Sequence, residues 1–228
     1  ANGKKRVQLD NGSEDTDATW KNNGKYYHFD TRGVMVYEWY PTQNTTSNLH
    51  SASNWSYFNS PEDGAKVVKG WFKVVGPNED TSFKELDSES FASVDGVKNE
   101  DARWYYNDGR EEGLVAGKIK KIKGKYYGFN LNGNMVKGTW VKGGKFYVFG
   151  KNGVYNASLS KKLRAAAGYE KEASTLLSLI GNPKKVQVLE NTCYGDGTEM
   201  YYYYDNYFAD IFKFSGTGKT IVLGVSAK

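Results

Sequence analysis

The chain has 228 residues, which is long enough for one or two domains with a sizeable core. Its formal net charge is +5 with both signs interspersed, and it lacks the dense Lys/Arg runs that would make nucleic acid an expected partner. A single cysteine, Cys193, excludes an intramolecular disulfide, and no apolar stretch is long enough for a transmembrane segment. Tyrosine and tryptophan are unusually abundant, which is typical of stacked hairpins and of surfaces that bind carbohydrates or cations.

The first segment, residues 1–18, is polar and rich in turn-forming residues, so we expect it to be loosely held. No signal peptide is present in the sequence, which begins at Ala1. We expect such a leader to have been removed or to lie outside this sequence.

An internal repeat organises residues 19–156. Gly124–Met135 matches Gly24–Met35 at the same offsets in Gly, Lys, both Tyr, Phe, the second Gly and Met, and Gly144–Gly153 is a third copy. We predict that each copy is a β-hairpin, with Asn130–Gly133 as its turn and Gly124 marking its start. One hairpin cannot bury its aromatic face alone, so several must stack.

Looser copies complete the array. Trp55–Gly64 is one, and Trp71–Gly76 is the first strand of another whose second strand, Arg103–Gly109, is delayed by an insertion at about 77–101. The sequence therefore predicts five hairpin units and a mainly β, solenoid-like array of tandem hairpins.

The pattern changes in residues 157–228, where we predict a small α+β module. Two helices are expected over residues 158–168 and 170–181, the second with an apolar stripe at helical spacing. Strands are expected over 185–190, 199–205, 208–214 and 219–225. Short links between these strands predict a four-stranded antiparallel sheet with the helices packed on it.

Catalysis finds little support in the residue types present. The only histidines are His28 and His50, and Cys193 has no histidine in its own module, so no nucleophile and base pair is evident. The acidic residues lack metal-binding spacing. We therefore expect no enzyme activity, no catalytic residue, no cofactor and no metal, although a pair of carboxylates of the glycoside-hydrolase kind stays open as a minor alternative.

The repeats resemble the cell-wall-binding repeat family, which includes choline-binding modules and glucan-binding repeats of Gram-positive surface proteins. The residues that carry this resemblance are Lys69-Gly70-Trp71, Gly124–Phe129 and Gly133–Trp140. It covers about residues 20–155 and implies ligand binding by aromatic side chains, which attract a quaternary ammonium through their ring faces.

Carried over residue by residue, the resemblance implies a set of aromatic ligand-binding candidates: Trp20, Tyr26, Trp55, Trp71, Trp104, Tyr126 and Trp140. Ile119 stands where the family has a first ring, and Tyr26, Tyr126 and Phe146 stand where it usually has Trp. Choline cages, sugar stacking and plain packing between hairpins therefore remain three interpretations of these rings.

The C-terminal module is similar to the group that contains β-lactamase-inhibitor protein and outer-membrane-assembly lipoproteins. Leu179–Pro183, Cys193–Gly197 and the tyrosine-rich strand carry this weaker resemblance. It implies a structural or protein-interaction role, with Tyr202 and Tyr204 as candidate exposed contacts.

These features together predict a non-enzymatic, extracellular, cell-wall-associated binding protein of a Gram-positive bacterium. Its expected partner is a cell-wall polymer, either choline-bearing teichoic acid or a glucan or peptidoglycan. The alternative is that the repeats form a structural stalk that presents the C-terminal module as an adhesin-like or inhibitor-like domain.

Overall fold

A computed structural model describes most of the chain: residues 18–30, 33–41, 55–60, 62–76, 102–109, 113–189 and 192–228. The polar N-terminal segment before residue 18 and the predicted insertion at 77–101 lie outside the described residues. The chain forms two compact units. The first contains the described residues up to Lys118 together with Phe129–Met135, and the second contains Ile119–Gly128 and Val136–Lys228.

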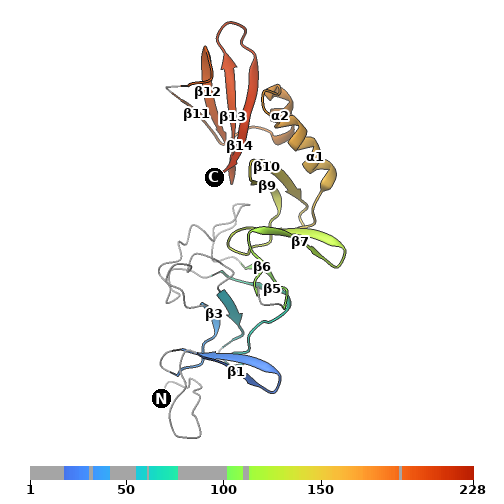
Figure 1. The fold of residues 1–228 in the computed structure, drawn as a ribbon, viewed down its shortest axis with the longest axis vertical. Helices are drawn as coiled ribbons and strands as arrows, with labels where there is room; N and C mark the ends of the chain where they lie inside the picture. The colour runs from blue at the N-terminus through green and yellow to red at the C-terminus, as the bar shows by residue number, and fades with distance from the viewer. Residues whose placement is uncertain are drawn as a thin grey trace. The chain divides into compact units, whose positions relative to one another are not determined.

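The described residues of the repeat region form five antiparallel two-stranded sheets in succession along the chain, as the repeat pattern predicts (Figure 1). Their strand pairs are β1 (Ala18–Asn22) with β2 (Lys25–Phe29), β3 (Glu38–Pro41) with β4 (Trp55–Phe58), β5 (Gly70–Val74) with β6 (Arg103–Asn107), β7 (Lys118–Ile122) with β8 (Lys125–Phe129), and β9 (Gly138–Lys142) with β10 (Lys145–Phe149). The delayed second strand is confirmed, because Trp71 of β5 pairs with Tyr106 of β6. The mainly β class predicted for the chain is likewise confirmed.

The repeated unit contains the predicted turn and a second turn that was not predicted. Gly124 does not mark the start of the hairpin; it occupies the turn between β7 and β8, where Lys123 and Gly124 have φ of 46° and 81°. Asn23-Gly24 has the same left-handed conformation between β1 and β2. Two successive positive φ values define the type I′ turn, whose twist matches that of a hairpin. Asn130–Gly133 is also a turn, as predicted: the Gly133 N–H donates to the Asn130 carbonyl at 3.0 Å, and the turn connects Phe129 to Met135, which form an antiparallel bridge.

Backbone hydrogen bonds hold the links onto the hairpins. In each of the five units, an N–H of the link donates to the carbonyl of the penultimate residue of the second strand, at 2.8–2.9 Å. The pairs are Val36 to His28, Val67 to Tyr57, Val115 to Tyr106, Val136 to Gly128 and Asn156 to Val148. A second set joins one hairpin to the link that follows the next, each at 2.8 Å: Lys66 to Tyr26, Met135 to Trp104 and Tyr155 to Tyr126. The repeats therefore stack through main-chain bonds as well as through their rings.

The C-terminal module has the predicted two helices and antiparallel sheet. Its elements are α1 (Ala157–Ala166), α2 (Ala173–Ile180), β11 (Lys185–Val188), β12 (Gly197–Tyr203), β13 (Tyr207–Phe214) and β14 (Thr220–Ala227). The strands lie in sequence order, as expected for short links. Asn156 caps α1 by accepting the N–H of Leu159 at 3.0 Å. Within the described ranges, neither helix has the length and apolar character that crossing a bilayer requires.

The last hairpin shares a hydrophobic cluster with this module. Phe146 of β10 is buried in the same cluster as Leu163 of α1 and Ile211 of β13. Its ring meets that of Tyr207 edge-on at 5.2 Å. The boundary predicted at residue 157 therefore falls between elements that are packed around one core.

Candidate aromatic binding site

The third hairpin places three large rings on one of its faces. Residues paired across antiparallel strands share a face, and successive residues alternate between faces. Trp71 pairs with Tyr106, and two residues along Lys73 pairs with Trp104. Trp71, Tyr106 and Trp104 therefore lie on the same side of β5–β6. Between them, Phe72 points to the opposite face.

The rings of this face meet at steep angles. The centroids of Trp71 and Trp104 lie 6.2 Å apart with ring planes at 87°, and those of Trp71 and Tyr106 lie 5.1 Å apart at 64°. Trp104 is 39% exposed, whereas Trp71 and Tyr106 are half-buried. One indole is thus held by its neighbours while the other remains open to solvent.

The strand and link that follow complete this site. The Phe129 ring lies 5.6 Å from that of Trp71, at 31°. The N–H of Met135 donates to the Trp104 carbonyl, which brings the half-buried Met135 next to Trp104. We call Trp71, Trp104, Tyr106, Phe129 and Met135 the tryptophan corner.

The tryptophan corner can hold two classes of ligand. Two indole planes near a right angle present ring faces and edges to a compact cation, and a quaternary ammonium, which has no hydrogen-bond donor, is attracted by the ring quadrupole. The open face of Trp104 can instead stack on the apolar face of a sugar.

Two of the other predicted rings lie on the opposite face of their hairpins. Gly70 pairs with Asn107, Ala18 with Phe29 and Gly138 with Phe149, and Asn107, Phe29 and Phe149 each bridge to the link that follows. These pairs align the hairpins. Trp20 and Trp140 then correspond to Phe72, and the positions equivalent to Trp71 are held by Thr19 and Thr139.

Tyr26 and Tyr126 are open to solvent, but each already has a cation over its ring. Tyr26 is 37% exposed and Tyr126 is 47% exposed. The Nζ atoms of Lys21 and Lys121 lie 5.5 Å and 5.7 Å from the respective ring centroids. A cationic ligand would have to displace these ammonium groups, so these two sites suit it less well than the tryptophan corner does.

Trp55 and Trp140 belong to the core. Trp55 is 2% exposed and is buried with Trp39, Tyr105 and Leu114. Trp140 is 8% exposed and belongs to a cluster with Val136 and Phe149. For these two rings, packing between hairpins is the interpretation that the structure supports.

Of the residues predicted for ligand binding, the structure brings together Trp71 and Trp104. Sequence reasoning missed Tyr106 and Phe129 as their partners. Tyr106 could have been found by strand alternation, because it lies two residues from Trp104. Phe129 could not, because its approach to Trp71 depends on how successive hairpins stack.

The four tyrosines Tyr201–Tyr204, at the end of β12, face the opposite way from the prediction. Tyr204 is only 8% exposed; its hydroxyl donates to the Gly181 carbonyl at 2.8 Å, and its ring stacks on Tyr207 at 4.7 Å. Burial raises the pKa of Tyr204 to about 12. Tyr202 is half-buried and packs against the cluster beneath the helices. The expected exposure of Tyr204 is therefore wrong, because alternation turns Tyr201 and Tyr203 outward instead.

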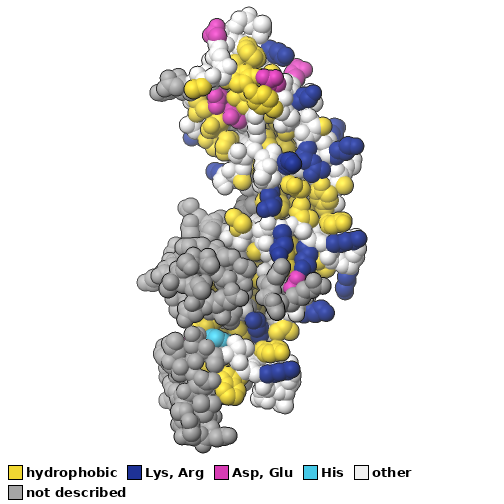
Figure 2. Space-filling model, in the orientation of Figure 1, with side chains coloured by type: hydrophobic (Ala, Val, Ile, Leu, Met, Phe, Trp, Pro, Cys, Tyr) yellow, Lys and Arg dark blue, Asp and Glu magenta, His cyan; other side chains and the backbone are white. Residues whose placement is uncertain are grey.

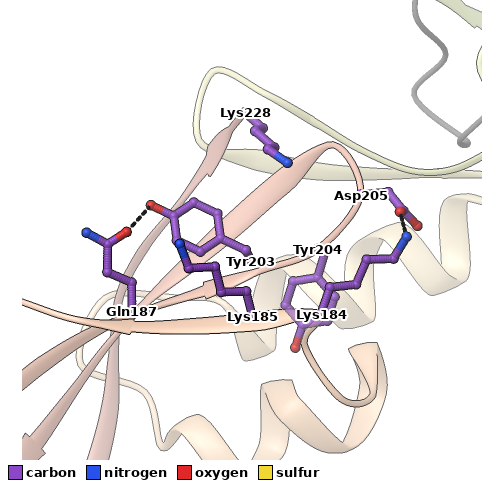
Figure 3. A pocket seen from close by; sticks show the side chains of 7 residues that line it. All are labelled: Lys184, Lys185, Gln187, Tyr203, Tyr204, Asp205 and Lys228. Carbon is purple, nitrogen blue, oxygen red and sulfur yellow. Dashed lines mark hydrogen bonds and ion pairs between the residues drawn. The ribbon is translucent and has the colours of Figure 1, made fainter.

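A cavity of 330 Å³ lies at the end of the C-terminal sheet (Figure 3). It is lined by Lys184, Lys185, Gln187, Tyr203, Tyr204, Asp205 and Lys228. Lys184 forms an ion pair with Asp205, and the Tyr203 hydroxyl donates to Gln187 at 3.1 Å. Lys184, Asp205, Tyr203 and Gln187 thus have partners within the cavity, and the cavity contains none of the aromatic side chains predicted for ligand binding in the repeats.

No family model matches the sequence, and no curated protein matches it either. Among solved structures, the chain is similar to choline binding protein F from Streptococcus pneumoniae, with 22% identity and a TM-score of 0.44 over 66% of this chain and 38% of that one. It is also similar to CbpJ from S. pneumoniae TIGR4, with 16% identity and a TM-score of 0.36 over 96% and 85% of the two chains. A third similarity is to a cell wall endolysin from phage Cp-1 complexed with choline, with 24% identity and a TM-score of 0.32 over 68% and 37%. The match thus spans well under half of the first and third of these proteins. Such low identities and TM-scores assign neither a family nor a ligand to this chain.

Proposed function

We propose that this chain is a non-enzymatic binding protein that attaches to a cell-wall polymer or glycan through its aromatic hairpins. The observation that carries the proposal is the tryptophan corner, where Trp104 is 39% exposed beside a nearly perpendicular Trp71. An indole left open to water next to other rings is typical of a ligand contact. Attachment to a cell-wall polymer would place the protein outside the cell, on the surface of a Gram-positive bacterium.

A choline-bearing polymer is the first ligand to test. The corner provides ring surfaces from two indoles at 87°, a geometry that surrounds a compact quaternary ammonium better than it covers a flat ring. A glucan or peptidoglycan strand is the second candidate, because the open face of Trp104 can stack on a pyranose.

The proposal that the chain acts without catalysis is supported by the environment of His28. This histidine is only 4% exposed, and its Nδ1 lies 2.9 Å from the Thr19 hydroxyl. A general base must reach its substrate, and His28 is enclosed by the first hairpin and its neighbours. His50 lies outside the described residues.

The test is a titration of the whole chain with choline, and then with soluble glucan and teichoic acid fragments. Calorimetry and tryptophan fluorescence measure the binding in each titration. Trp104→Ala should weaken binding at least about tenfold, because truncating a central aromatic contact has an effect of this size. Trp20→Ala is the matched control, since Trp20 is 37% exposed but lies on the opposite face of its hairpin.

Each outcome decides between the candidates. Saturable binding of choline that is lost in Trp104→Ala supports a cation site, and the same result with glucan alone supports sugar stacking. Unchanged binding in Trp104→Ala would reject the tryptophan corner as the site. A chain that binds none of these ligands would reject the proposed function and leave the repeats as a structural stalk.

A further inference from the structure

The sheet of the C-terminal module has a face that its helices do not cover. Tyr203 pairs with Phe208, Tyr201 with Asp210 and Glu199 with Phe212, so these residues share one side of β12–β13. The residues between them, such as Ile211, belong to the core cluster that includes both helices. We call Glu199, Tyr201, Tyr203, Phe208 and Asp210 the outer face.

Three aromatic rings gather on the outer face. The Phe208 centroid lies 4.6 Å from that of Tyr201 and 5.6 Å from that of Tyr203. The two tyrosines meet edge-on at 6.2 Å and 79°. All three are half-buried, so they present edges and tilted faces rather than one flat platform.

Two carboxylates adjoin these rings. Oδ1 of Asp210 is buried and accepts no hydrogen bond from the described residues. Burial, with a smaller contribution from the charge of Glu199, raises the pKa of Asp210 to about 6. Glu199 accepts a hydrogen bond from Thr192 at 2.7 Å. The same face also carries a cation, Lys185, which pairs with Tyr203 and has its Nζ 5.9 Å from the Tyr203 ring centroid. Among the described residues, no cation lies over the rings of Tyr201 and Phe208, which adjoin the two carboxylates. Figure 2 shows acidic side chains among hydrophobic ones on the C-terminal module.

The outer face has the chemistry of a cation site that also supplies a hydrogen-bond acceptor. A half-buried carboxylate without a donor is costly, and the repulsion between two like charges adds to that cost. A cation that donates a hydrogen bond to the other oxygen of the Asp210 carboxylate, which is not enclosed as Oδ1 is, would offset both costs, and the faces of Tyr201 and Phe208 would attract it further.

We propose that the outer face docks a partner protein through an arginine side chain, with the guanidinium against Tyr201 and Phe208 and hydrogen-bonded to Asp210. A guanidinium is planar, stacks on aromatic rings and has several donors for the two carboxylates. A quaternary ammonium has no donor for the Asp210 oxygen, and a sugar would need an open ring face that these mutually tilted rings do not provide. None of these residues belongs to the tryptophan corner, so this inference stands or falls independently of the proposed function.

The test uses the whole chain, isotopically labelled, and an NMR titration with the tripeptide acetyl-Gly-Arg-Gly-amide. The same tripeptide with citrulline in place of arginine is the matched control, because it has nearly the same shape without the charge. We expect saturable shifts at Tyr201, Phe208 and Asp210 with the arginine peptide, at least about tenfold weaker in Asp210→Asn. Asp196→Asn, which removes an exposed carboxylate of the same module, should bind as the unsubstituted chain does.

Several results would overturn the proposal. Equal shifts with the citrulline peptide would show that charge does not drive binding. Unchanged affinity in Asp210→Asn would show that Asp210 does not contact the guanidinium. An equal loss of affinity in Asp196→Asn would show that the negative charges act only at long range. Stronger shifts of the same residues by tetramethylammonium or by soluble glucan would assign the face to a different ligand.

Discussion

Gly128 lies directly against the ring of Phe149, which belongs to the next hairpin. A Cβ atom added to Gly128 would be 2.5 Å from Cζ and 2.9 Å from Cε2 of that ring. The backbone of Gly128 does not have a positive φ, so the close approach of the ring, and not the conformation, requires glycine here. This contact sets how closely the fourth and fifth hairpins stack.

Gly128→Ala should therefore destabilise the chain, by about 1–3 kcal/mol, because Phe149 is 2% exposed and has little room to move. Thermal or urea unfolding measures the change. Gly224→Ala is the control, since Gly224 lies in β14 with nothing within 4 Å of an added Cβ. Equal effects of the two substitutions would contradict a specific contact between Gly128 and the ring.

Tyr105→Phe should stabilise the chain by about 1 kcal/mol. Tyr105 is fully buried, its hydroxyl forms no hydrogen bond with the described residues, and burial raises its pKa. Removing that hydroxyl removes its desolvation cost. Tyr204→Phe is the opposite case, because the Tyr204 hydroxyl donates to Gly181, and it should destabilise by a similar amount. Urea unfolding of both variants checks the pair, and a loss of stability in Tyr105→Phe would refute the argument.

Asn130→Ala should cost about 2 kcal/mol of unfolding free energy. The Asn130 side-chain oxygen accepts the N–H groups of Asn132 and Asn134 at 3.0 and 2.9 Å, and these bonds are buried. Asn152 accepts the N–H of Val154 at 3.1 Å in an exposed link. Water can replace that bond, so Asn152→Ala should cost less than about 0.5 kcal/mol. Hydrogen exchange at the N–H groups of residues 132 and 134 gives a second readout.

Asp210→Asn should raise the thermal midpoint at about pH 7.5 but have little effect near pH 4. The folded-state pKa of Asp210, about 6, lies above the ordinary value of 3.8, so folding favours the protonated carboxyl. The ionised form lowers stability fully above pH 6, and this loss disappears as the pH falls below 4. Asn removes it at every pH. The difference between the two midpoints, measured across this range, should therefore shrink with acidification, and a constant difference would contradict the assigned cause.

The amino-acid sequence was sufficient for the hairpin units and for the order of the C-terminal elements, but it did not predict the pairing of β3 with β4 or the turn at Lys123-Gly124. The recurrence of Gly-Lys-Tyr-Tyr at Gly24 and Gly124 identified the hairpin units, and the register of Trp71 with Tyr106 confirmed a strand pair separated by a long insertion. Helical spacing of apolar residues located α2, and short links implied the order of the C-terminal strands. These features depend on local propensity and periodicity, which a single sequence displays directly.

The faces on which side chains lie were decided only by the tertiary structure. A shift of one residue in strand register moves a side chain to the other face of the hairpin. Trp20 therefore aligns with Phe72, although the repeat pattern suggested that it would have the same role as Trp71. Which tryptophans stay exposed was likewise settled by stacking, since Trp55 is enclosed by neighbouring units whereas Trp104 is not. The same holds for Asp210, whose burial and raised pKa come from the strands and rings around it. Such properties arise from contacts between residues far apart in the chain, and the local pattern of the sequence does not encode them.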